Sequence, residues 1–402
     1  MRGRGSRSED VRQGNLSQLL RYVHEHGPTA RSRLTAVLAL NRSTIGDLTR
    51  ELVDLGLLRE ETGRAAPDRS RGAAGGRPSY VVAPESSRVQ VLAVDVGVTH
   101  LTLARVGLGG AVIDRRDKSY RRGTRRPARV LEAIASLATD LLTPGPPVVG
   151  VGVAVPGVVR HADGQVRQAP NLGWRDVPLG ALTGDLLGLP VRVANDADLG
   201  IRAEHVRGAA KGDDNAVYLS GHSGVGAGIV AGGVPLGGRA GYAGEVGHFV
   251  VNADGLPCHC GSTGCWETEC GEERLFAIAG RPPGGGLAGV REVVSAAAAG
   301  DPLARRAVDH VAGWLGRGTA NVVNALNPQT VIMGGAFEEI LKVAEGTVLT
   351  ELRRTALAAL VEDVRLTRPA LGPDSTLIGA AELAFDPLIL DPLQYLPDRV
   401  AS

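Results

Sequence analysis

Cysteine is concentrated in one short segment of this chain. All four cysteines lie between positions 258 and 270, and Cys258, Cys260 and Cys265 are separated by one and four residues. Such a cluster, in a chain of this size without an apolar secretory segment at its Arg-rich N-terminus, is more typical of a metal site than of disulfides. Zn²⁺ prefers sulfur and nitrogen ligands in a tetrahedron, at about 2.0–2.3 Å. We therefore predict a zinc site here.

The spacing leaves the fourth zinc ligand open. His248, in the segment Gly244-Glu245-Val246-Gly247-His248, would complete a tetrahedron with the three cysteines. His259 and Cys270 compete with it on spacing alone.

A second candidate for chemistry is the pair Asn195-Asp196, which follows Val191–Val193 and Ala194 between the two lobes. An aspartate where a strand ends at a cleft can accept a proton from a sugar hydroxyl as a general base. Asn195 can both donate to and accept from neighbouring hydroxyls. The alternative is a turn cap, a role that Asn and Asp often take.

Two similar lobes are predicted to position these residues. Val91–Val94 is a continuous apolar run typical of a buried strand, Leu101–Val106 is expected to follow as a second strand, and the turn between them contains Asp95, Gly97 and Thr99. The same pattern of a strand followed by a glycine-containing turn repeats at Asn215–Leu219, where the turn contains Ser223, Gly224 and Gly226. A third apolar run ends in Gly334-Gly335. Turns of this kind can present backbone N–H groups to phosphates. Most glycine-rich turns are only tight hairpins, so the repetition carries the prediction.

The first 82 residues predict a separate anion-binding module. They hold 14 Arg, no Lys and 9 acidic residues, whereas the remainder holds 30 basic and 34 acidic residues. Apolar spacing predicts a helix over Asn15–His26 and a second short helix, capped by Thr29, that reaches Val37.

Asn41 is expected to cap a third helix, whose inward stripe is Ile45, Leu48, Leu52 and Leu55. Its outward face would carry Arg42, Ser43, Thr44, Gly46, Asp47 and Arg50. Two short helices before a polar third helix are the geometry that enters a DNA major groove. The alternative is the solvated face of an ordinary three-helix bundle, which we rank well behind.

A wing is predicted from Leu57 to Val82, with a flexible tip or linker over residues 63–79. Gly75-Gly76-Arg77-Pro78 could carry Arg77 into a narrow minor groove. A flexible charged linker is an equally good interpretation. No apolar run reaches the roughly 20 residues of a membrane span, so we expect a cytoplasmic protein.

The body, from about Val89 to Leu388, resembles the ROK family of sugar kinases and repressors. The resemblance rests on ordered motifs, listed here: Asp95–Thr99, Pro156-Gly157, Pro170–Trp174, Asn195-Asp196-Ala197, Gly224–Gly228, Gly244–His248, Cys258–Glu267 and Gly334-Gly335. With a winged helix-turn-helix over residues 1–82, the chain resembles the repressor branch. Residues 83–402 would form the ROK domain, with a zinc-binding loop over 248–267.

The resemblance implies an α/β, actin-like and hexokinase-like fold of two lobes around a sugar cleft. It implies a sugar held by Asn195, Asp196, Glu245, His248 and Glu267, and a structural zinc on His248, Cys258, Cys260 and Cys265. The loops with Asp95, Gly97, Thr99, Ser223, Gly224, Gly226, Gly334 and Gly335 would correspond to the nucleotide-phosphate loops of the kinases. Zinc would fix the loop that carries His248 and Glu267, and so shape the sugar pocket.

The phosphate loops depart from the kinase pattern. Kinases of this family usually have a glycine pair in the first loop, where this chain has Val98, and Gly-Thr-Gly in the second, where it has His222-Ser223-Gly224. A β-branched residue tolerates positive φ poorly. The sugar residues are retained while the nucleotide residues are altered, which fits a sensor better than an enzyme that uses ATP and Mg²⁺.

We therefore expect a sugar-responsive DNA-binding transcriptional regulator, with a repressor of carbohydrate metabolism genes as the leading case. Its partners would be double-stranded DNA, a sugar or sugar phosphate, and a second copy in a homodimer or homotetramer. The first alternative is a sugar kinase with an appended DNA-binding module, in which Asp196 is the general base. The second is a constitutive DNA-binding protein with a vestigial sugar fold.

Overall fold

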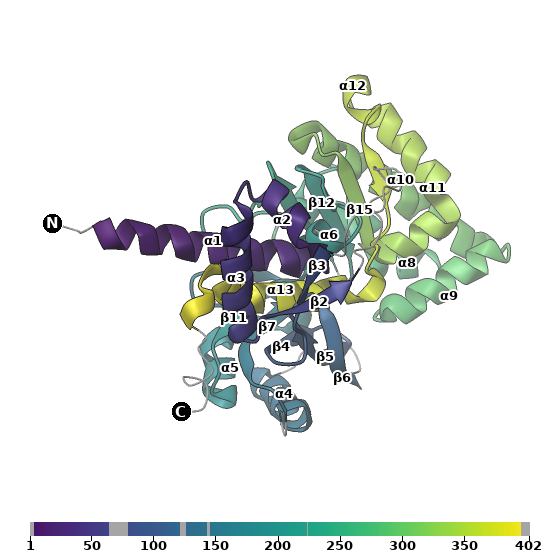
Figure 1. Cartoon of the computed structure of the whole chain (residues 1–402). Coiled ribbons are helices and arrows are strands. Elements are labelled where there is room, and N and C mark those ends of the chain that lie inside the picture. Colours follow the sequence, from purple (N-terminus) through teal and green to yellow (C-terminus); the bar gives the residue numbers. More distant parts are fainter. Residues whose placement is uncertain (1–3, 64–78, 121–125, 143–144, 223, 395–402) are drawn as a thin grey trace.

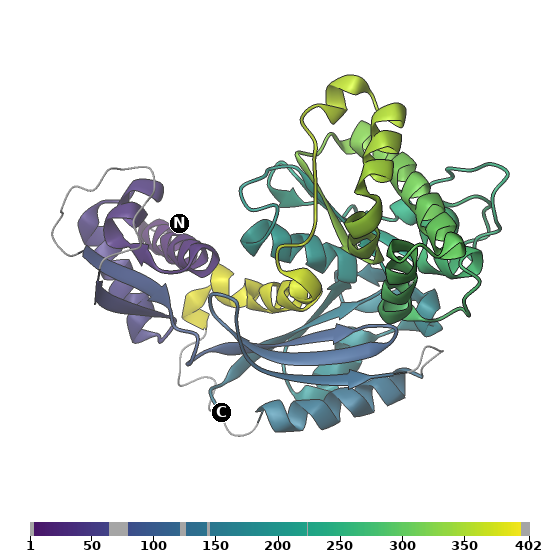
Figure 2. The ribbon, with the colours of Figure 1, turned by 90° about the vertical axis from the view of Figure 1, so that its right-hand side faces the viewer.

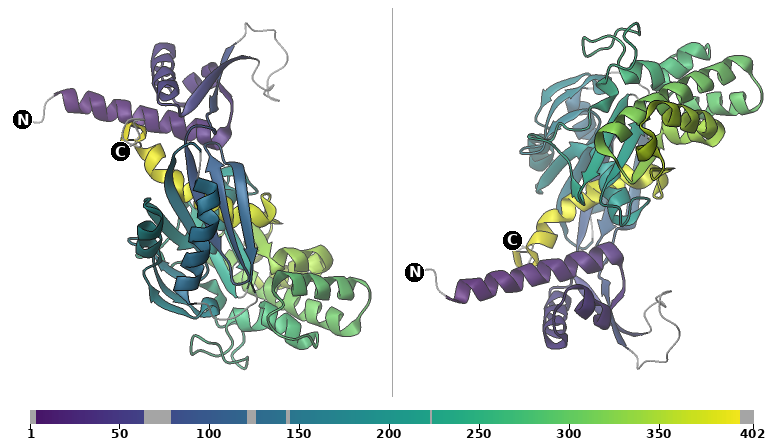
Figure 3. Two further views of the ribbon diagram at one scale, coloured as in Figure 1. Left: turned by 90° about the horizontal axis from the view of Figure 1, so that it is seen from below. Right: turned by 90° about the horizontal axis from the view of Figure 1, so that it is seen from above.

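The computed structural model describes residues 4–63, 79–120, 126–142, 145–222 and 224–394. A small N-terminal module lies at one end of an elongated molecule, and a group of helices from the second lobe lies at the other end (Figure 3; the elements are labelled in Figure 1). Arg77 and Ser223, two of the predicted contact residues, lie outside the described residues.

The N-terminal module contains three helices and a three-stranded antiparallel sheet in the order β1-β3-β2. Its elements are α1 (Arg4–His26), β1 (Thr29–Ala30), α2 (Arg31–Val37), α3 (Arg42–Asp54), β2 (Leu58–Gly63) and β3 (Ser79–Pro84). Three helices followed by a hairpin is the order expected for a winged helix-turn-helix. The first helix begins earlier than the expected Asn15, because the apolar spacing used to predict it covers only its second half.

The start of α3 follows from its sequence. The Asn41 Oδ1 accepts the backbone N–H of Thr44 at 2.8 Å, which confirms the predicted N-cap. Ile45, Leu48 and Leu52 are buried, as expected. The prediction for Gly46 was wrong: it is buried, with the Arg31 side chain next to it.

The predicted cap of the second helix was also wrong. Thr29 lies in β1 and its hydroxyl donates to the Gly27 carbonyl at 2.9 Å. Ala30 is the residue at the N-cap of α2, and no side chain caps this helix.

The body contains two five-stranded mixed sheets with the same topology. The first has the order β11-β7-β4-β5-β6 and the second the order β14-β13-β12-β15-β16. In each sheet the central strand is antiparallel to the strand that follows it and parallel to a later one. The strands of the first are β4 (Gln90–Val96), β5 (His100–Gly107), β6 (Ala111–Ser119), β7 (Val148–Val155) and β11 (Val191–Asn195).

The strands of the second sheet are β12 (Ala216–Gly221), β13 (Val225–Ala231), β14 (Val234–Pro235), β15 (Thr330–Gly335) and β16 (Arg365–Thr367). The repeated order confirms the predicted duplication of strand, turn and strand in two α/β lobes.

A small third sheet is inserted after β7. Its strands, in the order β10-β9-β8, are β8 (Val158–Arg160), β9 (Gln165–Ala169) and β10 (Trp174–Val177). The body's short 3-10 turns are η1 (Pro170–Leu172), η2 (Val246–His248), η3 (Gly372–Asp374) and η4 (Pro392–Gln394).

Helices cover the two sheets and join them. Those associated with the first sheet and the junction are α4 (Pro127–Leu142), α5 (Leu179–Leu187), α6 (Asp196–Arg207) and α13 (Ser375–Leu390). The second lobe carries α7 (Trp266–Cys270), α8 (Glu272–Ile278), α9 (Gly286–Ala298), α10 (Pro302–Leu326), α11 (Ala336–Thr355) and α12 (Ala358–Val361). Figure 2 shows α13, in yellow, between the N-terminal module and the rest of the body.

Helix α6 is packed closely on two sides, which fixes its position at the junction of the lobes. A side chain at Gly228 of β13 would collide with the carbonyl of Ala197, and one at Gly379 of α13 would collide with the carbonyl of Leu199. Backbones can approach this closely only where the Cβ is absent.

Among the described helices, none combines the length and the apolar character that crossing a bilayer requires.

Candidate functional site

Two adjoining cavities lie between the lobes. The first is lined by residues from both lobes, among them Asn171, Asn195, Asp196, His222, Gly224, Gly226, Glu245, His248, His259 and Glu267. The second, of about 350 Å³, is lined by the first turn of the first lobe and by Gly335. Pro156, Asp196 and His222 line both cavities and therefore lie at their junction. All five residues expected to hold a sugar line the first cavity.

Asp196 lies at the start of α6, where the two cavities meet. Burial raises the pKa of its carboxyl and the nearby Asp95 adds to this, while His222 opposes it. One carboxylate oxygen accepts the N–H of Ala197 at 3.0 Å. A carboxylate with a raised pKa and a free face toward a cavity is a suitable proton acceptor.

Asn195 acts as the N-cap of α6, the alternative that its sequence context left open. Its Oδ1 accepts from the backbone N–H groups of Ala197 at 2.7 Å and Asp198 at 3.3 Å. Its Nδ2 donates to the Gly157 carbonyl at 2.9 Å. The carboxamide oxygen is therefore used within the protein, and the second N–H of the amide is the group left to face a ligand.

Glu267 lies under a group of side chains from the cysteine loop. Its Oε1 is 3.1 Å from both the His259 Nδ1 and the Cys258 Sγ, and 3.7 Å from the His248 Nδ1. On its other side, a Cβ built on Gly224 would lie only 2.9 Å from its Oε2. Gly224 thus allows the second-lobe turn to approach this carboxylate closely.

Glu245 precedes the 3-10 turn η2 that carries His248. Burial raises the pKa of its carboxyl, His248 lowers it, and the neighbouring acids Asp196, Asp198 and Glu267 raise it further. Its side chain is 40% exposed, so its oxygens remain accessible from the cavity.

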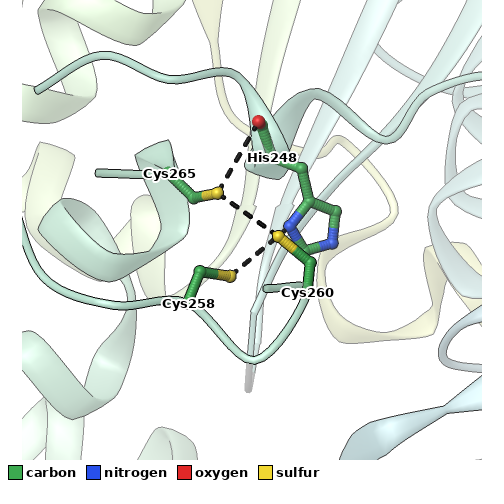
Figure 4. A group of neighbouring side chains, drawn as sticks. All are labelled: His248, Cys258, Cys260 and Cys265. Carbon is green, nitrogen blue, oxygen red and sulfur yellow. Dashed lines mark hydrogen bonds between the residues drawn. The ribbon is translucent and has the colours of Figure 1, made fainter. Parts of the chain in front are cut away.

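His248, Cys258, Cys260 and Cys265 form one compact group (Figure 4). Their potential ligand atoms all lie within 4.8 Å of one another. The His248 Nδ1 is 3.7 Å from the Cys258 Sγ, and the Cys260 and Cys265 Sγ atoms are 3.6 Å apart. Ligand atoms at about 2.3 Å from a tetrahedral zinc are about 3.7 Å from one another. The group is therefore consistent with a structural zinc site.

The two competing ligands are placed elsewhere. Cys270 is buried at the end of α7 and does not belong to the group. His259 is near Cys258, at 3.8 Å, but its Nδ1 is closer to Glu267. The geometry therefore favours His248 as the fourth ligand, and it assigns His259 to the wall of the first cavity.

The cysteine loop is held by a support that its sequence did not reveal. The Asn252 Nδ2 donates to the buried Glu269 of α7 at 2.8 Å. The backbone of Asn252 lies directly against Gly264, whose φ is +74°. A side chain at Gly264 would collide with the Asn252 carbonyl. These contacts hold the two ends of the loop next to each other without requiring a metal ligand.

The residues of the predicted phosphate loops separate into two groups. Asp95, Gly97, Thr99 and Gly335 line the second cavity, whereas Gly224 and Gly226 line the first. Gly334 lines neither; a side chain there would collide with the Tyr218 hydroxyl, so this glycine serves packing.

Two histidines cover the turns of the second cavity, and sequence reasoning identified only one of them. The His100 ring lies directly over Gly97, and its Nε2 is 3.0 Å from the Asp95 Oδ2. His222 lies against Gly335, and its Nδ1 is 2.8 Å from the Ser220 Oγ. A signal for His100 was present, since it ends the same turn, but its spacing matched no motif.

The outward face of α3 holds the residues expected to contact DNA. Arg42, Ser43, Asp47 and Arg50 are exposed and Thr44 is half-buried. Arg50 and Asp47 form an ion pair at 3.1 Å in which both side chains remain about 70% exposed. Pairs this exposed contribute little to stability, so Arg50 is available to another partner.

Comparison with known proteins agrees with this architecture. The ROK family model matches residues 91–386. The xylose repressor of Bacillus subtilis (strain 168) is 25% identical over 380 residues, which cover 94% of this chain and 96% of that protein.

Two solved structures are similar over different lengths. A ROK family transcriptional regulator, a homologue of the E. coli MLC protein, is 30% identical with a TM-score of 0.76 and covers 98% of this chain and 100% of its own. A ROK family glucokinase from Streptomyces griseus, in complex with glucose and AMPPNP, is 29% identical with a TM-score of 0.63. It covers 73% of this chain and 99% of its own. The family-model match, the fold and these similarities show that the chain belongs to the ROK family.

Proposed function

We propose that this protein is a sugar-responsive transcriptional regulator that represses genes of carbohydrate metabolism. One observation carries the proposal: the N-terminal module of three helices and a hairpin is attached to a ROK body whose sugar-side residues line one cavity. The likeness to the xylose repressor extends over both parts. The glucokinase likeness covers less of the chain, in agreement with a body shared by both branches.

In this proposal the sugar binds in the first cavity. Asp196, Glu245 and Glu267 accept hydrogen bonds from sugar hydroxyls, His248 contributes through its second ring nitrogen, and Asn195 donates its remaining amide N–H. Carboxylates suit such a ligand because each oxygen can accept from more than one hydroxyl.

A structural zinc would be held by His248, Cys258, Cys260 and Cys265. The metal would supply rigidity, since structural sites of this kind contribute directly to folding. His248 and Glu267 lie on or beside the zinc loop, so an ordered loop presents both to the sugar. We therefore assign zinc an indirect role in sugar recognition.

The DNA contact would be made by α3 in the major groove, through Arg42, Ser43, Thr44, Asp47 and Arg50, with Arg77 of the wing in the minor groove. Modules of this type usually read two half-sites about 34 Å apart, which requires a homodimer or homotetramer. A sugar changes DNA affinity only if it binds two states of the oligomer with different affinity.

The second candidate is a sugar kinase, favoured by the placement of Asp196. It would need ATP and Mg²⁺ in the second cavity, where His100 covers the first turn. Sugar-dependent ADP release by the zinc-loaded protein would support the kinase. We expect none above background.

The proposal is tested by measuring sugar binding and DNA binding on the same zinc-loaded preparation. A thermal-shift screen of mono- and disaccharides comes first, because a ligand at 100 times its Kd stabilises the native state by about 2.7 kcal/mol. A sugar that raises the Tm should also weaken binding to the protein's own upstream DNA. A sugar that binds without changing DNA affinity would contradict the proposed regulatory function.

A further inference from the structure

The charge of the first cavity restricts its ligand. Its described lining includes three carboxylates, Asp196, Glu245 and Glu267, and no lysine or arginine. Burial raises the pKa of the Asp196 carboxyl, with Asp95 adding to it, and burial raises the pKa of the Glu245 carboxyl, with Asp196 and Glu267 among the acids that add to it. A further anion placed among them would add to this repulsion.

The histidines of this cavity oppose only part of that charge: His222 acts against the raised pKa of Asp196 and His248 against that of Glu245, yet both pKa values stay raised. The His259 Nδ1 is paired with Glu267 at 3.1 Å, and the His222 Nδ1 with Ser220 at 2.8 Å. The His248 Nδ1 faces the cysteines, and a Zn²⁺ with three thiolates and a neutral imidazole carries a net charge of about −1.

The second cavity offers no free cation either, within the residues that the structure describes. Its two arginines are both engaged: Arg115 with Asp117 at 2.8 Å and with Asp374 at 2.7 Å, and Arg291 with Glu339 at 2.8 Å. Phosphate sites in proteins normally supply arginine, lysine or several backbone N–H groups.

From this we infer that the effector of the cleft is an uncharged sugar and that its phosphorylated form is rejected. The inference rests on the proposed function and narrows it to one chemical class of ligand. Carboxylate acceptors gain hydrogen bonds from hydroxyls, whereas a phosphate dianion would face three carboxylates without a partner.

The test uses matched pairs of neutral sugar and phosphate ester on the zinc-loaded full chain: glucose with glucose 6-phosphate, and N-acetylglucosamine with its 6-phosphate. Calorimetry should give at least tenfold tighter binding for the neutral member of any pair that binds. Raising the salt concentration should narrow the gap, because screening weakens the repulsion.

Tighter binding of a phosphate ester would overturn the inference but leave a sugar-responsive regulator intact. If neither member of any pair binds, and a wider set of neutral sugars also fails, both the inference and the sugar response fail. Retained DNA binding by the same sample separates this result from a misfolded preparation.

A second inference comes from the joint between the N-terminal module and the body. His24 of α1 is fully buried there, with its Nε2 2.9 Å from the Glu382 Oε2 of α13 and its Nδ1 accepting the Gly109 N–H at 3.0 Å. Arg207, the last residue of α6, donates to the Glu382 Oε1 at 2.7 Å and to the His24 carbonyl at 3.0 Å. Burial alone would raise the Glu382 pKa, but His24, Arg207 and Arg202 lower it to about 2.

The same helix joins this cluster to the sugar residues. Asp196 is the first residue of α6 and Arg207 is the last, so they are separated by about 17 Å along the axis. The close packing at Gly228 and Gly379 holds the first turn of α6, at Ala197 and Leu199, against β13 and α13. A shift of this turn would be carried along the helix to Arg207.

We propose that the His24–Arg207–Glu382 cluster couples the sugar cleft to the DNA-binding module through α6. A sugar that repositions Asp196 and the N-terminus of α6 would change the place of Arg207 and hence the orientation of α1. These three residues position elements and do not touch the ligand.

The test variant is Arg207→Gln, with Arg317→Gln as the control, because Arg317 forms an ion pair of similar length, but more exposed, with Glu351 in the second lobe. We expect Arg207→Gln to keep the sugar Kd within about threefold and to keep DNA binding, while the sugar effect on DNA affinity falls at least tenfold. An unchanged effect would overturn the coupling.

His24→Gln, which retains a hydrogen-bonding side chain, serves if Arg207→Gln does not fold, and the same outcomes apply. Hydrogen exchange of α1 in the native protein gives an independent readout. Sugar should alter exchange near His24, and an unaltered rate would also contradict the proposal. If the native protein shows no sugar effect on DNA at all, the proposed function itself fails, which is a distinguishable result.

Discussion

The two cavities of the cleft differ in how their polar side chains are used. In the first, Glu245 and Asp196 face the open space. In the second, the charged side chains are paired with one another, as in His100 with Asp95 and Arg115 with Asp117. One oxygen of Asp196 accepts the Ala197 N–H and Glu245 is 4.0 Å from the His248 Nε2, so both are less engaged than a side chain in a close ion pair, which must first lose its partner to bind a ligand. The difference favours a cleft that binds sugar over one that transfers phosphate.

Removing the zinc is expected to have the largest effect on the first cavity. Cys260→Ser should abolish stoichiometric zinc binding and lower the free energy of unfolding by several kcal/mol, since structural zinc contributes about 10–16 kcal/mol in zinc-finger peptides. Sugar binding should be lost with it, because His248 and Glu267 lose their support. Metal analysis and thermal unfolding measure both effects.

Cys270→Ala is the control, because Cys270 lies outside the four-residue group. It should keep one zinc per chain. Full zinc content in Cys260→Ser would refute the site.

The next effect is confined to the first cavity. Glu245→Gln should weaken sugar binding by about 10- to 100-fold, since a hydrogen bond to a charged group contributes about 1.5–3 kcal/mol. DNA binding in the absence of sugar should remain. Calorimetry and an operator-binding assay measure the two, and Glu362→Gln, an exposed position in the second lobe, is the control. A normal sugar response would place the ligand elsewhere.

A smaller effect is expected on the face of α3. Arg42→Ala or Arg50→Ala should weaken binding to operator and nonspecific DNA alike and reduce the slope of log affinity against log salt by about 1 if each contacts one phosphate. Binding titrations at several salt concentrations provide the slope. Arg129→Ala, on α4 of the body, should leave it unchanged. Unaltered slopes for both test variants would exclude these arginines from the interface.

Local sequence patterns predicted most of the helices and strands but few of the contacts between residues far apart in the chain. The Asn41 cap and the buried stripe of α3 followed from spacing, because both depend on residues within one turn. His24 and Glu382 meet across 358 positions, and neither belongs to a motif. Their contact depends on how α1 packs against α13, which no local signal contains.

The same limit applies within the cleft. The cysteine spacing predicted a metal site but left His248, His259 and Cys270 open as the fourth ligand; the family resemblance implied His248, and the geometry of the fold favours it. For Asn195 the sequence left two interpretations open, hydrogen bonds to hydroxyls or a cap, and in the fold its oxygen caps α6. A helix cap and a contact to a ligand would use the same amide atoms of Asn195, so the sequence alone could not decide between these two roles.

The smallest effect concerns the second cavity and its pH dependence. Burial lowers the His100 pKa, but Asp95 and neighbouring acids outweigh this, so the folded value lies above the ordinary 6.5. The charged pair therefore stabilises the fold fully below pH 6.5, and this contribution disappears as the pH rises through the folded pKa. His100→Asn should lower the free energy of unfolding more at pH 5.5 than at pH 8.5, as measured by denaturant titration. An equal loss of unfolding free energy at both pH values would mean that His100 stabilises this turn only by packing over Gly97. The ion pair with Asp95 would then make no contribution.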